Sequence, residues 1–213
     1  MNLLVIVLAY LIGSIPMGYL VIRFSKQQDL TQIASGRTGA TNAARAGGAG
    51  AGLATGILDG IKGAGAIWFA RVLLGGNPFA IADPLVESIA GIAAVAGHNY
   101  SIYLKFHGGA GTGPNVGAAI AFQPIAALVL PVLVPLVLIT TGYASVASIA
   151  AAVAIPAIFL LSHFIFATPL EYVFFGVCTF ALVVWSLRPN IARLRAGEER
   201  MVGPRAKRRE SAK

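Results

Sequence analysis

Charged residues and cysteine are both scarce in this sequence. Asp, Glu, Lys and Arg together make up 11% of its 213 residues, and only one residue is cysteine. Soluble domains carry about 25% charged residues, so this chain lacks the polar cover that a surface facing only water requires. The single cysteine, Cys178, lies in an apolar stretch, so we exclude a disulfide framework and interpret the thiol as a packing group.

Common catalytic and metal-binding motifs are missing as well. The chain has no glycine-rich Walker loop ending in Lys and Ser or Thr, no Gly-x-Ser-x-Gly elbow and no Cys/His metal spacing. No serine or cysteine stands out as a nucleophile with its base. These absences argue against a P-loop, a serine-hydrolase centre and a Cys/His metal site.

Hydrophobic residues are abundant and make up 57% of the sequence. They form long runs at residues 3–24, 53–74, 85–104, 116–139, 146–166 and 172–187. Such runs predict membrane helices, because a helix satisfies its own backbone in lipid. We expect an all-α polytopic membrane protein in which residues 1–190 form a single transmembrane helical bundle. The first run lacks the basic start and cleavage site of a signal peptide, so we interpret it as a span.

The positions of Lys and Arg predict the orientation of this bundle. Lys26, Arg37 and Arg45 place the first loop on the cytoplasmic side. The loop at 75–84 has no Lys or Arg and therefore belongs outside. Lys105 places the next polar segment inside again.

The carboxyl-terminal end is strongly basic, because residues 188–213 hold nine of the sixteen Lys and Arg. We interpret 191–213 as a cytoplasmic tail that binds anionic lipid rather than nucleic acid. If each of the six runs crosses the membrane once, three crossings follow the cytoplasmic segment at Lys105 and place this tail outside, which contradicts its basic composition. The segment 108–141 contains four prolines, so we predict two short passes or a re-entrant hairpin there. The expected fold is a bundle of about seven transmembrane helices, with the N-terminus outside and the C-terminus inside.

The first polar loop has the composition of an anion site. Its glycines let backbone N–H groups converge, and two arginines add positive charge suited to phosphate. The polar side chains of this loop are Ser35, Arg37, Thr38, Thr41, Asn42 and Arg45. The alternative at this point is a flexible glycine loop whose arginines contact lipid headgroups.

A second candidate anion site follows the third apolar run. His98 precedes the glycine-rich stretch at 108–113, and its imidazole is suited to proton transfer near neutral pH. The other interpretation is a histidine hydrogen-bonded within the bundle. We interpret His107 as a solvated loop residue and His163 as a bundle hydrogen-bonder.

Asp59 and Lys62 are ionisable residues inside the second apolar run. They stand three positions apart, so they lie on one face of a helix. Ionisable groups at that depth are costly and are usually paired or turned toward a cavity. We interpret them as a structural ion pair that supports the first loop.

Several short motifs, taken in order, resemble those of the acyl-phosphate-dependent glycerol-3-phosphate acyltransferases of bacterial membranes. The resemblance covers nearly the whole chain. It rests on GSIPMGY at 13–19, SG at 35–36, GATN at 39–42, LDGIKG at 58–63, GH at 97–98, FHGG at 106–109, SVAS at 145–148 and NIARL at 190–194.

This resemblance implies a seven-helix enzyme, multi-pass in the bacterial inner membrane, that serves phospholipid biosynthesis. Its expected substrates are acyl phosphate and glycerol 3-phosphate, which give lysophosphatidic acid. It implies no cofactor and no metal. The acyl chain is expected in a groove on the lipid side, with both phosphates held by the glycine loops.

The resemblance also implies roles for individual residues. Ser35 and Arg45 match residues that hold the phosphate of the acceptor, while Ser148 and Asn190 match residues that line the glycerol pocket. His98 and Ser148 are the candidate catalytic residues. The remaining candidate substrate-binding residues are Arg37, Thr41, Asn42, Gly108, Gly109 and Gly111.

The chain departs from the family pattern at two polar positions. Ala110 stands where the second cradle has lysine, and Leu187 stands where the family has histidine. Arg37 stands where the family has asparagine, and we hypothesise that it replaces the missing charge. Two other classes of function remain open: a non-catalytic member that binds a phosphate-bearing lipid or metabolite, and a small transporter. No inverted repeat supports the transporter.

Overall fold

The computed structural model describes residues 1–203 and 206, and within them the regular structure is helical. The helices are α1 (Asn2–Ser14), α2 (Met17–Lys26), α3 (Ala40–Gly47), α4 (Ala49–Gly75), α5 (Pro84–Asn99), α6 (Thr112–Phe122), α7 (Ile125–Thr141), α8 (Ala144–Phe166), α9 (Glu171–Ser186) and α10 (Arg188–Arg195). Two short 3-10 turns, η1 (Leu30–Gln32) and η2 (Ile102–Leu104), lie in the loops. Residues 204–205 and 207–213 of the predicted basic tail lie outside the described residues.

Large apolar side chains are exposed along the outside of the bundle. Leu3 and Leu128 are each 74% exposed and Phe164 is 78% exposed. A soluble protein rarely leaves so many apolar groups in water, whereas lipid solvates them. Among the described residues, Asn2–Lys26 and Ala144–Phe166 are long and apolar enough to cross a membrane unaided, with mean hydropathies of 2.2 and 2.3.

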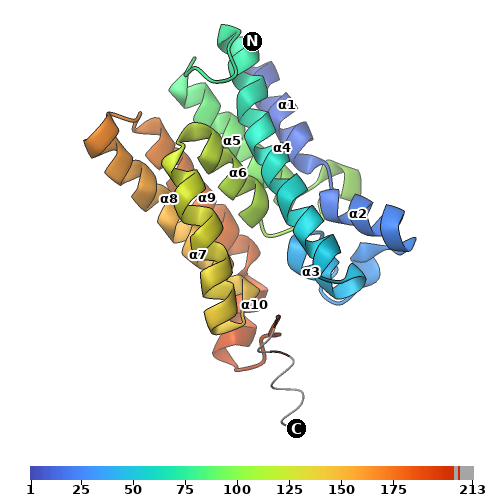
Figure 1. Ribbon diagram of the computed structural model, residues 1–213. Coiled ribbons are helices and arrows are strands. Elements are labelled where there is room, and N and C mark those ends of the chain that lie inside the picture. The colour runs from blue at the N-terminus through green and yellow to red at the C-terminus, as the bar shows by residue number, and fades with distance from the viewer. Residues whose placement is uncertain (204–205, 207–213) are drawn as a thin grey trace.

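The loops collect at two ends of the bundle (Figure 1). The tail end is the end at α10, where the Asn99 amide donates to Ser186 Oγ at 2.9 Å and Val202 N donates to the Gly142 carbonyl at 2.9 Å. The N-terminal end is the opposite one, where the Gln123 amide donates to Thr168 Oγ1 at 2.8 Å. Chain segments distant in sequence therefore meet at each end.

The run at 116–139 is divided between two helices. α6 ends at Phe122 and α7 begins at Ile125, and between them the chain turns at the N-terminal end. The eleven residues of α6 are about 16 Å long, roughly half the thickness of a bilayer core. The turn returns the chain to the tail end, as two short passes or a hairpin require. The number of crossings and the orientation stay predictions.

The first run, 3–24, is also divided, because the helix breaks between α1 and α2. Pro16 precedes α2, and the carbonyl of Ile15 at the break accepts a hydrogen bond from Lys62 Nζ at 2.7 Å. A carbonyl freed by the break is thus satisfied by a side chain of α4. The Asp59–Lys62 pair is therefore linked by a hydrogen bond to the break between α1 and α2.

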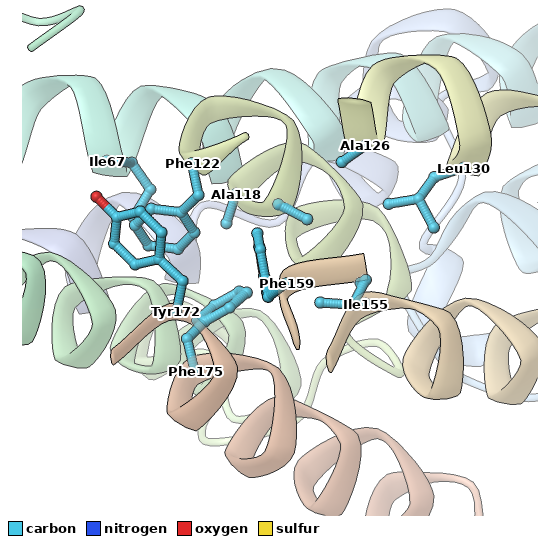
Figure 2. Packing of buried hydrophobic residues seen from close by; sticks show 10 residues of the cluster. Ile67, Ala118, Phe122, Ala126, Leu130, Ile155, Phe159, Tyr172 and Phe175 are labelled. Carbon is cyan, nitrogen blue, oxygen red and sulfur yellow. The ribbon is translucent and has the colours of Figure 1, made fainter. Parts of the chain in front are cut away.

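The largest aromatic cluster of the core joins five helices (Figure 2). Phe122 of α6 stacks on Tyr172 of α9 with ring centroids 4.3 Å apart, and Phe159 and Phe175 pack edge-on against Phe122. Ile67 of α4 and Leu130 of α7 belong to the same cluster. This packing holds α6 and α7 against α8 and α9.

Glycines bring α4 and α6 into direct backbone contact. A side chain on Gly63 would overlap the backbone of Pro114, and one on Gly117 would overlap the carbonyl of Gly60. Helices in membranes associate by close packing of small residues, since lipid gives no hydrophobic drive between them. The contact places α6 beside the charged segment of α4.

A charged network lies buried near the N-terminal end. Arg71 Nε lies 2.9 Å from Glu87 Oε2, and its other nitrogens donate to the Ala121 carbonyl at 3.0 Å and the Tyr172 hydroxyl at 3.2 Å. The Tyr172 hydroxyl in turn donates to Glu87 Oε2 at 2.7 Å. Glu87 Oε1 accepts from the backbone N–H of Ala82 at 2.8 Å. The network joins α4, α5, α6 and α9.

Candidate active site

A cavity of about 1040 Å³ extends from the tail end into the bundle. Its polar wall comes from the first loop, α3, the start of α6 and the segment after α9. Its apolar wall comes from α4, α6 and α7 and ends near Trp68, Ile120 and Leu130. The polar and charged residues of the wall are Ser35, Arg37, Thr41, Asn42, Arg45, Asp59, His98, Thr112, Ser145, Ser148, Asn190, Arg193, Glu199 and Arg200. The same cavity therefore has a cationic end and an apolar end.

Asn42 organises the first loop from within. Its side-chain N–H groups donate to the carbonyls of Ile33 at 2.9 Å and Arg37 at 2.8 Å, and its oxygen accepts from Ser35 N at 3.4 Å. A weaker link joins the two glycine-rich segments, because Thr38 N lies 3.5 Å from the Gly108 carbonyl. Asn42 thus shapes the loop that carries Ser35 and Arg37.

Positive charge is concentrated on the wall at the tail end. Burial lowers the pKa of Arg37, and Arg193 lowers it further while Glu199 opposes the shift. The pKa of Arg45 is lowered by burial and then by Arg200, with Glu199 again opposing. Crowded, partly buried guanidinium groups favour an anion beside them.

Asp59, Lys62 and His98 form a buried cluster beside the cavity, and Asp59 and His98 line it. Lys62 Nζ lies 2.9 Å from Asp59 Oδ1 and 2.9 Å from His98 Nδ1, and His98 Nδ1 lies 3.4 Å from Asp59 Oδ1. A lysine ammonium can only donate, so His98 Nδ1 accepts and the proton of a neutral ring is on Nε2. Lys62, paired with Asp59, thus donates both to His98 and to the Ile15 carbonyl at the helix break. The structural role of this pair stays a prediction.

The glycines of the second segment pack against His98 and Asn99. A side chain on Gly109 would overlap His98 Nε2, and one on Gly108 would overlap the His98 carbonyl. Gly111 has a φ of +87°, and a side chain there would press on the amide of Asn99. Of this segment, Ala110, Thr112 and Gly113 line the cavity. The three glycines let the segment approach His98 and Asn99, and their predicted contact with substrate stays a prediction.

The two departures from the family pattern meet in space. Leu187 belongs to a small buried cluster with Ala152 and Val183, and Ala110 packs against this cluster. Both Ala110 and Leu187 line the cavity. An apolar contact therefore occupies the place where the resemblance implies a lysine and a histidine.

Arg37 reaches the same region from the first loop. Its guanidinium Nη2 donates to the carbonyl of Ser186, next to Leu187. The arginine is thus anchored at the end of α9 while its side chain remains on the cavity wall. This position is compatible with the hypothesis that Arg37 replaces the positive charge missing at Ala110.

Sequence reasoning missed Arg193 of α10 and the segment that follows this helix. Arg193, Glu199 and Arg200 line the cavity, and Glu199 is 7% exposed. The signal that was available is the pair of adjacent acids, Glu198 and Glu199, inside a strongly basic end. Part of the expected lipid-binding tail is therefore part of the cavity wall.

The other histidines lie away from the cavity. His163 Nδ1 lies 2.7 Å from the Thr168 carbonyl within the bundle. His107 is exposed, with Nδ1 2.9 Å from the Lys105 carbonyl. Among the residues that the structure describes, no group of three or more His, Cys, Asp or Glu side chains is arranged to hold a metal ion.

Comparison with known proteins gives consistent matches over the chain. The family model described as "Glycerol-3-phosphate acyltransferase" matches residues 3–197. "Glycerol-3-phosphate acyltransferase 3" of Dehalococcoides mccartyi (strain CBDB1) is 38% identical over 210 residues, which cover 96% of this chain and 97% of the relative. "Glycerol-3-phosphate acyltransferase 2" of Moorella thermoacetica is 39% identical over 206 residues, which cover 97% of this chain and 100% of the relative.

Solved structures share the fold. The crystal structure of PlsY (YgiH), an integral membrane glycerol 3-phosphate acyltransferase, in its glycerol 3-phosphate form has a TM-score of 0.80 and 31% identity, covering 95% of this chain and 96% of that one. Its lysophosphatidic acid form has a TM-score of 0.79 and 30% identity, covering 95% of each chain.

Proposed function

The chain belongs to the glycerol-3-phosphate acyltransferase family, and from this we propose that it transfers a fatty acyl group from acyl phosphate to glycerol 3-phosphate. The products are lysophosphatidic acid and inorganic phosphate, so the protein serves phospholipid biosynthesis. We place it in the bacterial inner membrane with its tail end in the cytoplasm. Glycerol 3-phosphate then enters from the water and the acyl chain from the lipid.

One observation carries this proposal: a single cavity has a cationic end and an apolar end. Arg37 and Arg45 border its polar part, while Ile57, Trp68 and Val134 border its apolar part. An acyl phosphate has the same two-part chemistry, with a phosphate head and a hydrocarbon tail. Guanidinium groups suit the head, and burial of methylene groups favours the tail.

The reaction requires little covalent help from the protein, because an acyl phosphate is already activated. The 1-hydroxyl oxygen of the acceptor attacks the acyl carbon and forms the new ester bond. The bond from that carbon to the phosphate oxygen breaks, and phosphate leaves with the bonding electrons. A phosphate oxygen of the substrates takes the hydroxyl proton. Orientation and charge stabilisation then account for the acceleration.

We propose for the individual residues the roles that the family resemblance implies. Ser35 and Arg45 bind the phosphate of the acceptor, with Thr41 beside them, and Arg37 contributes charge to the donor phosphate. His98, whose Nδ1 accepts from Lys62 of the Asp59–Lys62 pair, lies on the cavity wall as the candidate catalytic residue. Ser148 and Asn190 bind the glycerol moiety.

A direct assay tests the proposal. Purified protein in detergent is given acyl phosphate and glycerol 3-phosphate, and lysophosphatidic acid and inorganic phosphate are measured together. We expect equimolar release of the two products and no product when acyl-coenzyme A replaces acyl phosphate. Binding of glycerol 3-phosphate without product would favour a non-catalytic binding protein and would contradict the proposal.

A further inference from the structure

Glu199 is a buried carboxylate on the wall of a cavity that is otherwise rich in positive charge. Its side chain is 5% exposed. A carboxylate in this position repels phosphate unless its charge is neutralised by neighbours. Because the proposed substrates are both anions, the presence of a negatively charged residue on this wall needs an explanation.

Three groups from two other elements satisfy this carboxylate. Arg193 Nε donates to Oε2 at 2.9 Å and Asn190 Nδ2 donates to Oε1 at 2.7 Å. Ser145 Oγ, at the start of α8, lies 3.4 Å from the same Oε1. The arginine neutralises the charge, so the cluster presents a polar but uncharged surface at this point. Glu199 thereby joins the segment after α10 to α8.

The contact with Asn190 determines which way its amide points. An ionised carboxylate only accepts hydrogen bonds, so the NH₂ group of Asn190 must face Glu199. The amide oxygen then points away from Glu199, and this atom is buried without a hydrogen-bond partner. Asn190 lines the cavity. A buried acceptor without a partner is costly, so the site is built for a ligand that donates a hydrogen bond.

We propose that Glu199 is a positioning residue that orients the Asn190 amide so that its oxygen accepts a hydrogen bond from the secondary hydroxyl of glycerol 3-phosphate. The inference rests on the proposed function. A phosphate group without protons offers no donor to this oxygen, whereas a hydroxyl does. The primary hydroxyl loses its proton during acyl transfer. The secondary hydroxyl keeps its proton throughout the reaction, so it can donate to the Asn190 oxygen at every stage. Glu199 therefore contributes to selection of the acceptor without touching it.

The test compares two acceptors that differ in one hydroxyl. 3-Hydroxypropyl phosphate keeps the phosphate and the reactive hydroxyl of glycerol 3-phosphate but lacks the secondary one. For the unaltered protein we expect kcat/KM to be about tenfold lower with this analogue, the value of one buried hydrogen bond. In Glu199→Gln the side-chain amide can donate or accept, so Asn190 is free to rotate. Most of the tenfold discrimination should then be lost through a higher KM for glycerol 3-phosphate.

Matched variants separate this role from a general effect on the structure. Glu198→Gln removes the same charge from the neighbouring exposed residue and should keep full discrimination. Glu199→Asp keeps an acceptor-only carboxylate and should retain discrimination in part. The KM for acyl phosphate should stay within about twofold in all three variants, because one hydrogen bond in the acceptor pocket does not reach the donor.

The outcomes divide cleanly. Full discrimination in Glu199→Gln, or loss of binding of both substrates together, overturns the inference. If the unaltered protein makes no product, the proposed function fails. The inference is then decided by calorimetric binding of the two acceptors to the same variants, with the same tenfold difference expected.

Discussion

Arg37 is anchored to the carbonyl of Ser186 and lies on the cavity wall close to Ala110 and Leu187. Its neighbours show how far single residues could be assigned from the sequence. Residue type and spacing were enough to select Ser35, Arg37 and Arg45 as one group. They did not indicate that the amide of Asn42 hydrogen-bonds within the loop, and its predicted contact with substrate stays a prediction.

Replacing Arg37 tests whether it supplies the charge that the second segment lacks. For Arg37→Ala we expect binding of the phosphate-bearing substrates to weaken about ten- to a hundredfold, the value of one charge-assisted hydrogen bond. Adding Ala110→Lys should restore part of the loss. Arg188→Ala is the matched control, since Arg188 donates to the nearby Trp185 carbonyl at 2.9 Å but lies outside the cavity. Normal binding of glycerol 3-phosphate by Arg37→Ala would end the hypothesis.

At the scale of elements, the helices follow from hydropathy, but their breaks and contacts do not. The runs at 53–74 and 146–166 became α4 and α8 with small shifts at their ends. The run at 116–139 became two helices, and the proline content of that region indicated the division. Pro131 and Pro135 nevertheless lie inside α7. Prolines are tolerated inside membrane helices where neighbouring groups satisfy the freed backbone.

The Arg71–Glu87 pair is an element-level feature with a measurable effect on stability. Arg71→Leu leaves the buried Glu87 carboxylate without its charge partner, so we expect a loss of about 3–5 kcal/mol in the free energy of unfolding. The double variant Arg71→Leu with Glu87→Gln should recover most of it, because no unpaired charge remains. Thermal unfolding in detergent measures both. Equal loss in the single and double variants would show that packing, and not the charge, is responsible.

At the scale of the whole molecule, the described loops gather at two ends, and the orientation of those ends in the membrane is testable. In a Cys178→Ala background, single cysteines are placed by Ala80→Cys in the loop after α4 and by Ala196→Cys after α10. Both positions are exposed. If the N-terminal end faces outward, a membrane-impermeant maleimide labels position 80 in intact cells and position 196 only after permeabilisation. The reverse pattern would overturn the predicted orientation.

The sequence by itself determined the class of protein, because apolar content and run length leave lipid as the only suitable solvent. It also determined the family, since the order of short motifs is a property of the chain alone. Only the tertiary structure decided which groups meet. Arg37 meets the carbonyl of Ser186 and Glu199 meets Ser145 because segments far apart in the chain pack together, and packing between distant segments has no local signature in the sequence.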